Sequence, residues 1–206
     1  MDKLIIGKTE MNITRIEDKC NEVVVELESS DVIKLGFKVR HMSRILNFKI
    51  ISINDDVFYS RNADVSAQKM KEILNMHFCA TTYKLHIDYK SIPQSGEQLK
   101  NEIQNDIKEG YDGIFTIGGT GVSARDITYE VVNAFCEKKI PGLMEYIRVK
   151  FGEENPHALL SRSIAGINGS TLIYTIPGSK KAVIEYMEIL LKTMEHIIHI
   201  NNGLGH

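Results

Sequence analysis

Hydrophobic and polar residues follow two different patterns along the chain, and the change falls near residue 46. Before that point, two short runs rich in β-branched residues, 23–27 and 32–35, are separated by the polar segment Ser29-Ser30-Asp31. Short apolar runs with a polar turn between them are typical of a β-hairpin. We therefore predict a small β-rich extension over residues 1–46, to which the sequence assigns no function.

From residue 47 to residue 206 the pattern predicts strands that alternate with helices. Short apolar runs predict strands at residues 49–53, 83–87, 113–117 and 171–176. Apolar residues at helical spacing predict helices at residues 64–75, from Leu99 through Ile107 to a stop at Gly110, at 127–137, and after 179. Residues 54–62, which are mostly polar, predict a loop. Strands joined through helices form parallel β-α-β units, so we predict one α/β domain with a mostly parallel sheet and helices on both faces.

Composition and charge exclude several classes of protein. With 43% hydrophobic and 25% charged residues among 206, the chain is typical of a globular protein with a packed core. The net charge of −2 argues against nucleic acid or an anionic membrane as partner. We expect neither a signal peptide nor a membrane span, because no long apolar run is present. Cys20, Cys79 and Cys136 are far apart in sequence, which fits a reducing, cytoplasmic environment.

A glycine-rich turn between a predicted strand and a predicted helix is the strongest chemical signal. It comprises Gly118, Gly119, Thr120 and Gly121, followed by Ser123 and Asp126. Backbone N–H groups in such a turn, next to a helix N-terminus, favour the binding of phosphate. The motif matches neither a P-loop nor a dinucleotide-binding fingerprint. A tight turn without a ligand is the alternative interpretation.

Asp126 and Arg162 each allow two interpretations. The pattern Ser123-x-x-Asp126 is typical of a helix start, in which both side chains cap free N–H groups. A carboxylate beside a phosphate loop is also suited to hold Mg²⁺. Arg162, which follows Ser161, could bind phosphate with two parallel hydrogen bonds or form a surface ion pair.

A second strand-to-helix turn, Pro177-Gly178-Ser179, precedes the last predicted helix. Gly178 would allow a ligand to approach the backbone closely, and the following Lys180 could meet an anion. The alternative is a purely structural turn.

Taken together, these segments resemble the molybdopterin adenylyltransferases, the MogA/MoaB family of molybdenum cofactor biosynthesis. The resemblance covers about residues 47–198. It rests on five short motifs in order: Gly118-Gly119-Thr120-Gly121, Arg125-Asp126-x-Thr128, Ile140-Pro141-Gly142, Leu160-Ser161-Arg162 and Pro177-Gly178-Ser179. Two further segments match more loosely, Ser52-Ile53-Asn54-Asp55 and Asp64-Val65-Ser66.

The resemblance implies a three-layer α/β/α domain that transfers AMP from Mg-ATP to the terminal phosphate of molybdopterin and releases pyrophosphate. It implies that the loop from Gly118 to Gly121, with Ser123, Ser161 and Arg162, contacts substrate, and that Pro177, Gly178 and Ser179 line the same pocket. Asp126 would be the catalytic acidic residue beside Mg²⁺. The family further implies a homo-oligomer, a trimer or hexamer, and molybdopterin synthase or a molybdenum-insertion protein as candidate partners.

One departure from the family pattern concerns the proline that precedes the second predicted helix. The family commonly has an acidic residue after it, whereas this chain has Pro93-Gln94. Asp88 or Glu97 are candidates to replace that carboxylate. The departure leaves a second hypothesis open, a pterin-binding or scaffold protein with weak catalysis. A third is a domain for another phosphorylated metabolite.

Overall fold

The computed structural model describes residues 3–6, 9–19, 22–28, 34–40, 44–60, 62–81 and 83–201. Backbone contacts divide the chain into two compact units. One comprises Met1–Ile45 with Phe78–Lys84, and the other comprises Leu46–His77 with Leu85–His206. None of the described helices is long and apolar enough to cross a membrane.

The first unit contains a four-stranded antiparallel sheet in the order β1-β2-β3-β4. Its strands are β1 (Lys3–Ile6), β2 (Thr9–Lys19), β3 (Glu22–Glu28) and β4 (Lys34–Arg40). The predicted run at residues 23–27 lies within β3, which pairs with β4. Residues 29–33, which include part of the second predicted run, lie outside the described residues. The boundary at residue 46 stays a prediction.

The second unit is built on a six-stranded sheet in the order β6-β5-β7-β10-β9-β8. The strands β5, β7 and β10 run parallel, β9 is antiparallel to β10, and β8 is antiparallel to β9. The sheet is therefore mixed, with a parallel centre. Its strands are β5 (Ile45–Ile53), β6 (Lys84–Ile92), β7 (Gly113–Ile117), β8 (Lys138–Lys139), β9 (Ala165–Asn168) and β10 (Thr171–Ile176).

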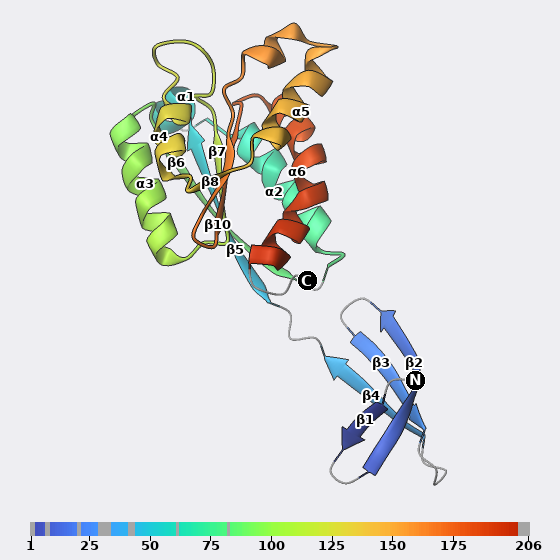
Figure 1. Ribbon diagram of the computed structural model, residues 1–206. Coiled ribbons are helices and arrows are strands. Elements are labelled where there is room, and N and C mark those ends of the chain that lie inside the picture. The colour runs from blue at the N-terminus through green and yellow to red at the C-terminus, as the bar shows by residue number, and fades with distance from the viewer. Residues whose placement is uncertain are drawn as a thin grey trace. The chain divides into compact units, whose positions relative to one another are not determined.

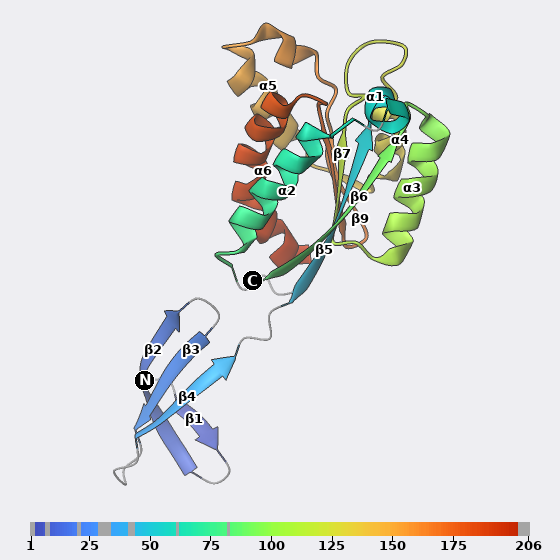
Figure 2. The ribbon, with the colours of Figure 1, turned by 180° about the vertical axis from the view of Figure 1, so that it is seen from behind.

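Helices cover both faces of this sheet, which gives three layers (Figures 1 and 2). On one face lie α3 (Gly96–Glu109) and α4 (Thr128–Phe135). On the other lie α2 (Val65–Phe78), α5 (Pro141–Gly152) and α6 (Lys180–Asn201). Two short helices complete the fold, α1 (Asp55–Ser60) after β5 and the 3-10 helix η1 (Pro156–Leu160) after α5. The predicted α/β fold is confirmed.

The predicted loop at residues 54–62 is wrong, because α1 occupies most of it. The side chain of Asn54 caps this helix, since its Oδ1 accepts hydrogen bonds from the backbone N–H of Asp56 at 2.9 Å and of Val57 at 3.3 Å. The helix buries none of its residues. It therefore lacks the apolar periodicity by which a helix is recognised in sequence.

The core lies around the central strands. Every residue of β7 and β10 is buried, and Phe115 stacks on Tyr174 with ring centroids 5.5 Å apart. Phe48 of β5 meets Phe115 edge to face at 5.4 Å. Because β5, β7 and β10 are parallel, the segments that follow them emerge at one edge of the sheet, where ligands bind in open α/β folds.

Candidate functional site

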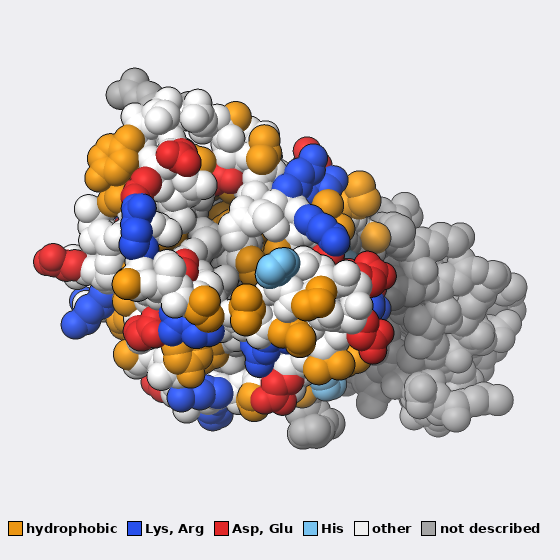
Figure 3. Space-filling model, turned by 90° about the horizontal axis from the view of Figure 1, so that it is seen from above, with side chains coloured by type: hydrophobic (Ala, Val, Ile, Leu, Met, Phe, Trp, Pro, Cys, Tyr) orange, Lys and Arg blue, Asp and Glu red, His pale blue; other side chains and the backbone are white. Residues whose placement is uncertain are grey.

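A cavity of about 830 Å³ lies at the carboxyl ends of β5, β7 and β10. Its volume falls within the range of small-molecule sites, roughly 300–1,000 Å³. The walls come from the start of α1, the glycine-rich loop after β7, the η1 segment, the turn after β10 and the first half of α6. Figure 3 looks down on this end of the domain, where the surface is hollowed.

Two glycines give the loop after β7 its path. Gly118 has φ +104° and Gly119 has φ +63°, values that L side chains rarely adopt. A Cβ on Gly118 would lie 2.5 Å from the carbonyl oxygen of Ile53, and one on Gly119 would lie 2.4 Å from Oγ1 of Thr128. The Thr128 hydroxyl donates a hydrogen bond to the Gly118 carbonyl at 2.8 Å. The loop is therefore packed tightly against β5 and the start of α4.

Asp126 lines the cavity and folds the end of this loop on itself. Its Oδ2 accepts a hydrogen bond from the backbone N–H of Ser123 at 2.9 Å. Burial by itself raises the pKa of Asp126, but hydrogen bonds from Ser123 and the Gly121 backbone, with the nearby charge of Arg162, bring the pKa below its usual value. The group is therefore ionised at neutral pH. The side chains of Ser123 and Asp126 do accept backbone N–H groups, from Arg125 and Ser123, as the cap interpretation expected. These bonds close the loop and do not cap α4, which begins at Thr128 with Ile127 at its N-cap.

Arg162 supports the same loop from outside the cavity. Its Nε donates to the Gly121 carbonyl at 2.6 Å, and its Nη2 donates to the Asp126 carbonyl at 2.7 Å. Its Nη1 forms an ion pair with Glu130, and the guanidinium lies 5.7 Å from the ring centre of Tyr129. Because these partners engage the guanidinium, Arg162 holds the loop in place here and does not present the two-donor phosphate clamp that its sequence context allowed.

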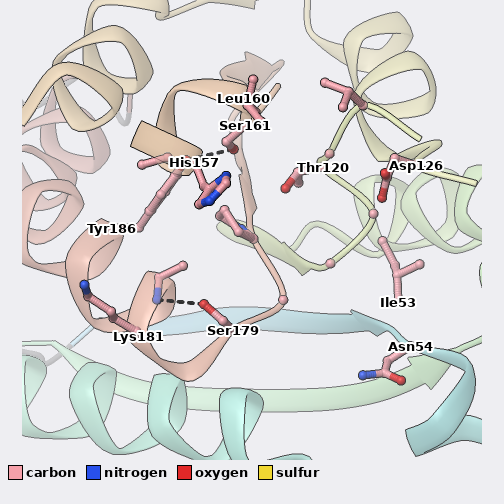
Figure 4. Close-up of a pocket in the computed structure, with 18 of the residues that line it drawn as sticks. Ile53, Asn54, Thr120, Asp126, His157, Leu160, Ser161, Ser179, Lys181 and Tyr186 are labelled. Carbon is pink, nitrogen blue, oxygen red and sulfur yellow. Dashed lines mark hydrogen bonds between the residues drawn. The ribbon is translucent and has the colours of Figure 1, made fainter. Parts of the chain in front are cut away.

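Ser161 lies on the opposite wall. Its Oγ accepts a hydrogen bond from the Tyr186 hydroxyl at 3.0 Å and lies 2.8 Å from Oγ of Ser163. Tyr186 comes from α6 and is buried. In Figure 4, Thr120 and Asp126 lie on one side of the cavity, and His157, Lys181 and Tyr186 lie on the other.

The turn after β10 forms the floor between these walls. The Gly178 carbonyl accepts a hydrogen bond from the Ser66 hydroxyl at 2.8 Å, and Ser179 Oγ accepts one from the backbone N–H of Ala182 at 3.1 Å. Lys181 lines the cavity and pairs with Glu185 at 3.4 Å. Lys180, the basic residue singled out in the sequence, faces a smaller neighbouring hollow.

The start of α1 adds acidic groups that the sequence did not single out as site residues. Asp55 and Asp56 line the cavity together with Gln94. Asp88 and Glu97, the candidates to replace the missing carboxylate, do not line the cavity, which corrects that expectation. Asp88 is engaged elsewhere, with the Tyr111 hydroxyl at 2.6 Å and His86 at 3.3 Å, and Glu97 is likewise not among the lining residues.

The structure thus brings most of the predicted site residues to one cavity. They are Gly118, Gly119, Thr120, Gly121, Asp126, Ser161, Pro177, Gly178 and Ser179. Ser123 and Arg162 lie beside it, at an adjoining hollow. Asp55, Asp56, His157, Lys181 and Tyr186 were missed. A signal for the first two was present, because Asn54-Asp55-Asp56 directly follows a buried strand at the ligand-binding edge of the sheet.

Comparison with known proteins assigns the family. The model described as "Probable molybdopterin binding domain" matches residues 49–196. The chain belongs to this family. The family expected from the five motifs is thereby confirmed, and the match falls on the unit that carries the cavity.

Several relatives align with the chain over about the same part of its length. Molybdenum cofactor biosynthesis protein B of Staphylococcus epidermidis is 30% identical over 166 residues, covering 77% of this chain and 90% of that protein. Molybdopterin adenylyltransferase of Helicobacter pylori is 28% identical over 162 residues, covering 77% and 89%. A structure of the molybdopterin biosynthesis enzyme MoaB from Thermus thermophilus aligns with TM-score 0.68 and 29% identity, covering 77% and 97%.

Other relatives are much longer. The chain covers 25% of the molybdenum cofactor synthesis protein cinnamon of Drosophila melanogaster and 16% of gephyrin of Dictyostelium discoideum. The molybdopterin-binding domain therefore occurs both as most of a short protein and as one part of a longer one.

Proposed function

We propose that this protein acts in molybdenum cofactor biosynthesis by transferring AMP from Mg-ATP to the terminal phosphate of molybdopterin. A phosphate oxygen of molybdopterin attacks the α-phosphorus of ATP, the bond from that phosphorus to the bridging oxygen breaks, and pyrophosphate leaves. The observation that carries this proposal is one cavity in which a glycine-rich loop, Asp126 and Ser161 face the same space. Family membership supplies the identity of the substrates.

The loop and the carboxylate have complementary tasks in this reaction. Backbone N–H groups of a tight loop stabilise phosphate oxygens, and in phosphoryl and nucleotidyl transfer the protein chiefly positions groups and neutralises developing charge. No nucleophile from the protein is needed, because the substrate phosphate attacks. The Tyr186 hydroxyl donates a hydrogen bond to Ser161 Oγ and thereby orients this hydroxyl to contact molybdopterin.

The donors at the cavity fit Mg²⁺. Asp126 offers hard carboxylate oxygens, which this ion prefers. Among the described residues, no three histidine, cysteine or acidic side chains gather into a group that would hold a metal ion by themselves. That fits Mg²⁺, which is commonly held by one or two carboxylates together with substrate phosphates and water. Bound there, Mg²⁺ would neutralise phosphate charge and orient ATP.

The direct test is incubation of the full chain with molybdopterin and Mg-ATP, followed by mass detection of adenylylated molybdopterin and of pyrophosphate. We expect both products in equal amounts. If molybdopterin binds but neither product forms, the protein is a binder and the reaction is wrong. If molybdopterin does not bind, the cavity serves another phosphorylated metabolite.

Gln94 favours a second candidate function, a molybdopterin-binding protein with weak catalysis. Gln94, with a neutral amide side chain, lines the cavity where the family pattern has an acidic residue. A carboxylate binds Mg²⁺ better than an amide does. If wild type is inactive and Gln94→Asp is active, this second function is the correct one. If wild type is fully active and Gln94→Asp changes nothing, another carboxylate serves the metal.

A further inference from the structure

Asp55 links two walls of the cavity through its two carboxylate oxygens. Its Oδ1 accepts a hydrogen bond from the backbone N–H of Gln94 at 2.9 Å. Its Oδ2 forms an ion pair with the guanidinium of Arg125, 70 residues further along the chain. The first contact fixes the side chain at the wall formed by α1 and the segment after β6. The second directs it towards the glycine-rich loop.

Arg125 immediately precedes Asp126, so its guanidinium brings a positive charge next to Asp55 at the wall where Asp126 also lies. The guanidinium marks a position at which a cation is stabilised by the Asp55 carboxylate. The side chain of Arg125 is 70% exposed, and that of Asp55 is 31% exposed. An exposed ion pair of this kind is weak and readily exchanged. Arg125 can therefore leave Asp55 at little cost when another cation arrives.

We propose that Asp55 is a second metal-holding carboxylate of this site, and that Arg125 occupies it until a divalent cation enters. Arg125 then turns to the phosphate groups that arrive with the metal. The assignment rests on the proposed function for the identity of the reaction. It gives a chain with Gln94 in place of an acidic residue a second carboxylate, Asp55, in the cavity that Asp126 also lines.

A purely structural ion pair between Asp55 and Arg125 would show the same hydrogen bonds as a metal-holding Asp55. A measurement of metal binding distinguishes the structural role from the metal-holding role. The probe is Mn²⁺ alone, a paramagnetic substitute for Mg²⁺. Electron paramagnetic resonance measures the concentration of free Mn²⁺ and so gives the affinity of the protein for the ion. The variants are Asp55→Asn, Arg125→Gln and the double variant. Asn at position 55 keeps an oxygen for the Gln94 N–H, so the wall should remain folded. Thermal unfolding checks this.

We expect the two single variants to change Mn²⁺ affinity in opposite directions. Asp55→Asn should weaken binding at least about tenfold, the lower end of the loss when a metal site loses a supporting group. Arg125→Gln should strengthen binding, because the competing cation is gone. The double variant should bind as weakly as Asp55→Asn, which shows that the gain depends on Asp55.

Asp56→Asn is the matched control, since it removes the same charge one residue along in α1 and from the same cavity. Equal weakening by Asp56→Asn and Asp55→Asn would overturn the assignment, because the effect would then be general electrostatics. So would unchanged Mn²⁺ affinity in Asp55→Asn, or a double variant that binds as tightly as Arg125→Gln.

The adenylylation assay distinguishes this inference from the proposed reaction. If wild type forms no product but the Mn²⁺ pattern appears, the carboxylate assignment stands and the reaction is wrong. If product forms but Asp55→Asn binds Mn²⁺ like wild type, the reaction stands and Asp55 is only a structural tie.

Discussion

Two neighbouring walls of the cavity, the glycine-rich loop after β7 and the start of α1, are held in different ways. The glycine-rich loop is held by close backbone packing at Gly118 and Gly119 and by the bonds of Arg162. The start of α1 buries none of its residues, and it is tied to the loop by the exposed pair of Asp55 and Arg125. We call the loop the fixed wall, because buried backbone packing holds it, and the start of α1 the adjustable wall, because an exposed ion pair ties it to the loop.

This difference suits nucleotidyl transfer. A preorganised set of N–H donors stabilises phosphate without rearrangement at the moment of reaction. Under the proposal for Asp55, a carboxylate that exchanges Arg125 for a divalent cation would let the metal enter and leave.

Gly118→Ala should damage the fixed wall most. The new Cβ would meet the Ile53 carbonyl at 2.5 Å with φ at +104°, so the loop must move or the central strands must separate. We expect a loss of about 3 kcal/mol or more in the free energy of unfolding, from strain and overpacking together. Urea unfolding measures it.

Gly178→Ala is the control for that variant. Its Cβ would meet only the Gly118 Cα at 3.5 Å, which is ordinary contact. Stability close to wild type is therefore expected. If Gly118→Ala were equally harmless, the loop would not be the rigid wall described here.

Arg162→Ala and Arg125→Ala compare the two walls directly. Removing Arg162 leaves the Gly121 and Asp126 carbonyls without their charged donor and should cost about 2–3 kcal/mol. Removing Arg125 breaks an exposed ion pair and should cost about 1 kcal/mol or less. Chemical denaturation gives both values. Equal losses would contradict the distinction between the walls.

Asp106 of α3 provides a test away from the cavity. Its carboxylate forms an ion pair with Lys49 at 3.6 Å, yet burial raises its pKa to about 6. Because the folded protein favours the protonated carboxyl, Asp106 stabilises the folded state fully when the pH is below its unfolded pKa near 3.8. This contribution is lost as the pH rises through the folded pKa of about 6. Asp106→Asn should therefore be the more stable form at neutral pH, by on the order of 2 kcal/mol.

The measurement for Asp106 is the difference between the two melting curves as a function of pH. The advantage of Asp106→Asn should shrink as the pH falls below about 6. An advantage that stays constant with pH would show that the carboxylate does not titrate as stated. Molybdopterin affinity should be equal in both forms, since Asp106 does not line the cavity.

Tyr186→Phe should have a small effect on stability, because it removes one hydroxyl and keeps the ring. Ser161 would lose a hydrogen bond of 3.0 Å, worth about 1 kcal/mol. We expect molybdopterin binding about fivefold weaker and a melting temperature lower by about 2–4 °C. Calorimetric titration measures the affinity. Unchanged affinity would mean that Tyr186 does not orient Ser161.

The fixed wall could be predicted from sequence, and the adjustable wall could not. A buried strand followed by Gly118-Gly119 predicts a sharp turn at the ligand-binding edge, and the turn at Gly178 follows a second parallel strand to the same edge. These features depend on local backbone chemistry. The helix α1 has six exposed or half-buried residues and buries none of them, and its short sequence lacks helical apolar spacing, so the pattern predicts a loop instead.

The directions in which side chains point could not be predicted from the sequence either. The sequence places Arg162 near Ser161 but does not show that its guanidinium points behind the loop to Gly121. That direction is decided by the approach of two segments 41 residues apart. Asp55 is a similar case, because its partners Gln94 and Arg125 come from two distant segments that only the folded sheet brings together.

The catalytic role of Asp126 is tested most directly by Asp126→Asn, assayed for molybdopterin binding and for adenylylation in the same preparation. Asn keeps an oxygen to accept the Ser123 N–H, so the loop and molybdopterin affinity should stay close to wild type. The charge that would hold Mg-ATP is lost, so product formation should fall by roughly a hundredfold or more. Wild-type turnover in this variant would contradict the catalytic role of Asp126. Its role would then be the structural hydrogen bond that it accepts from the Ser123 N–H.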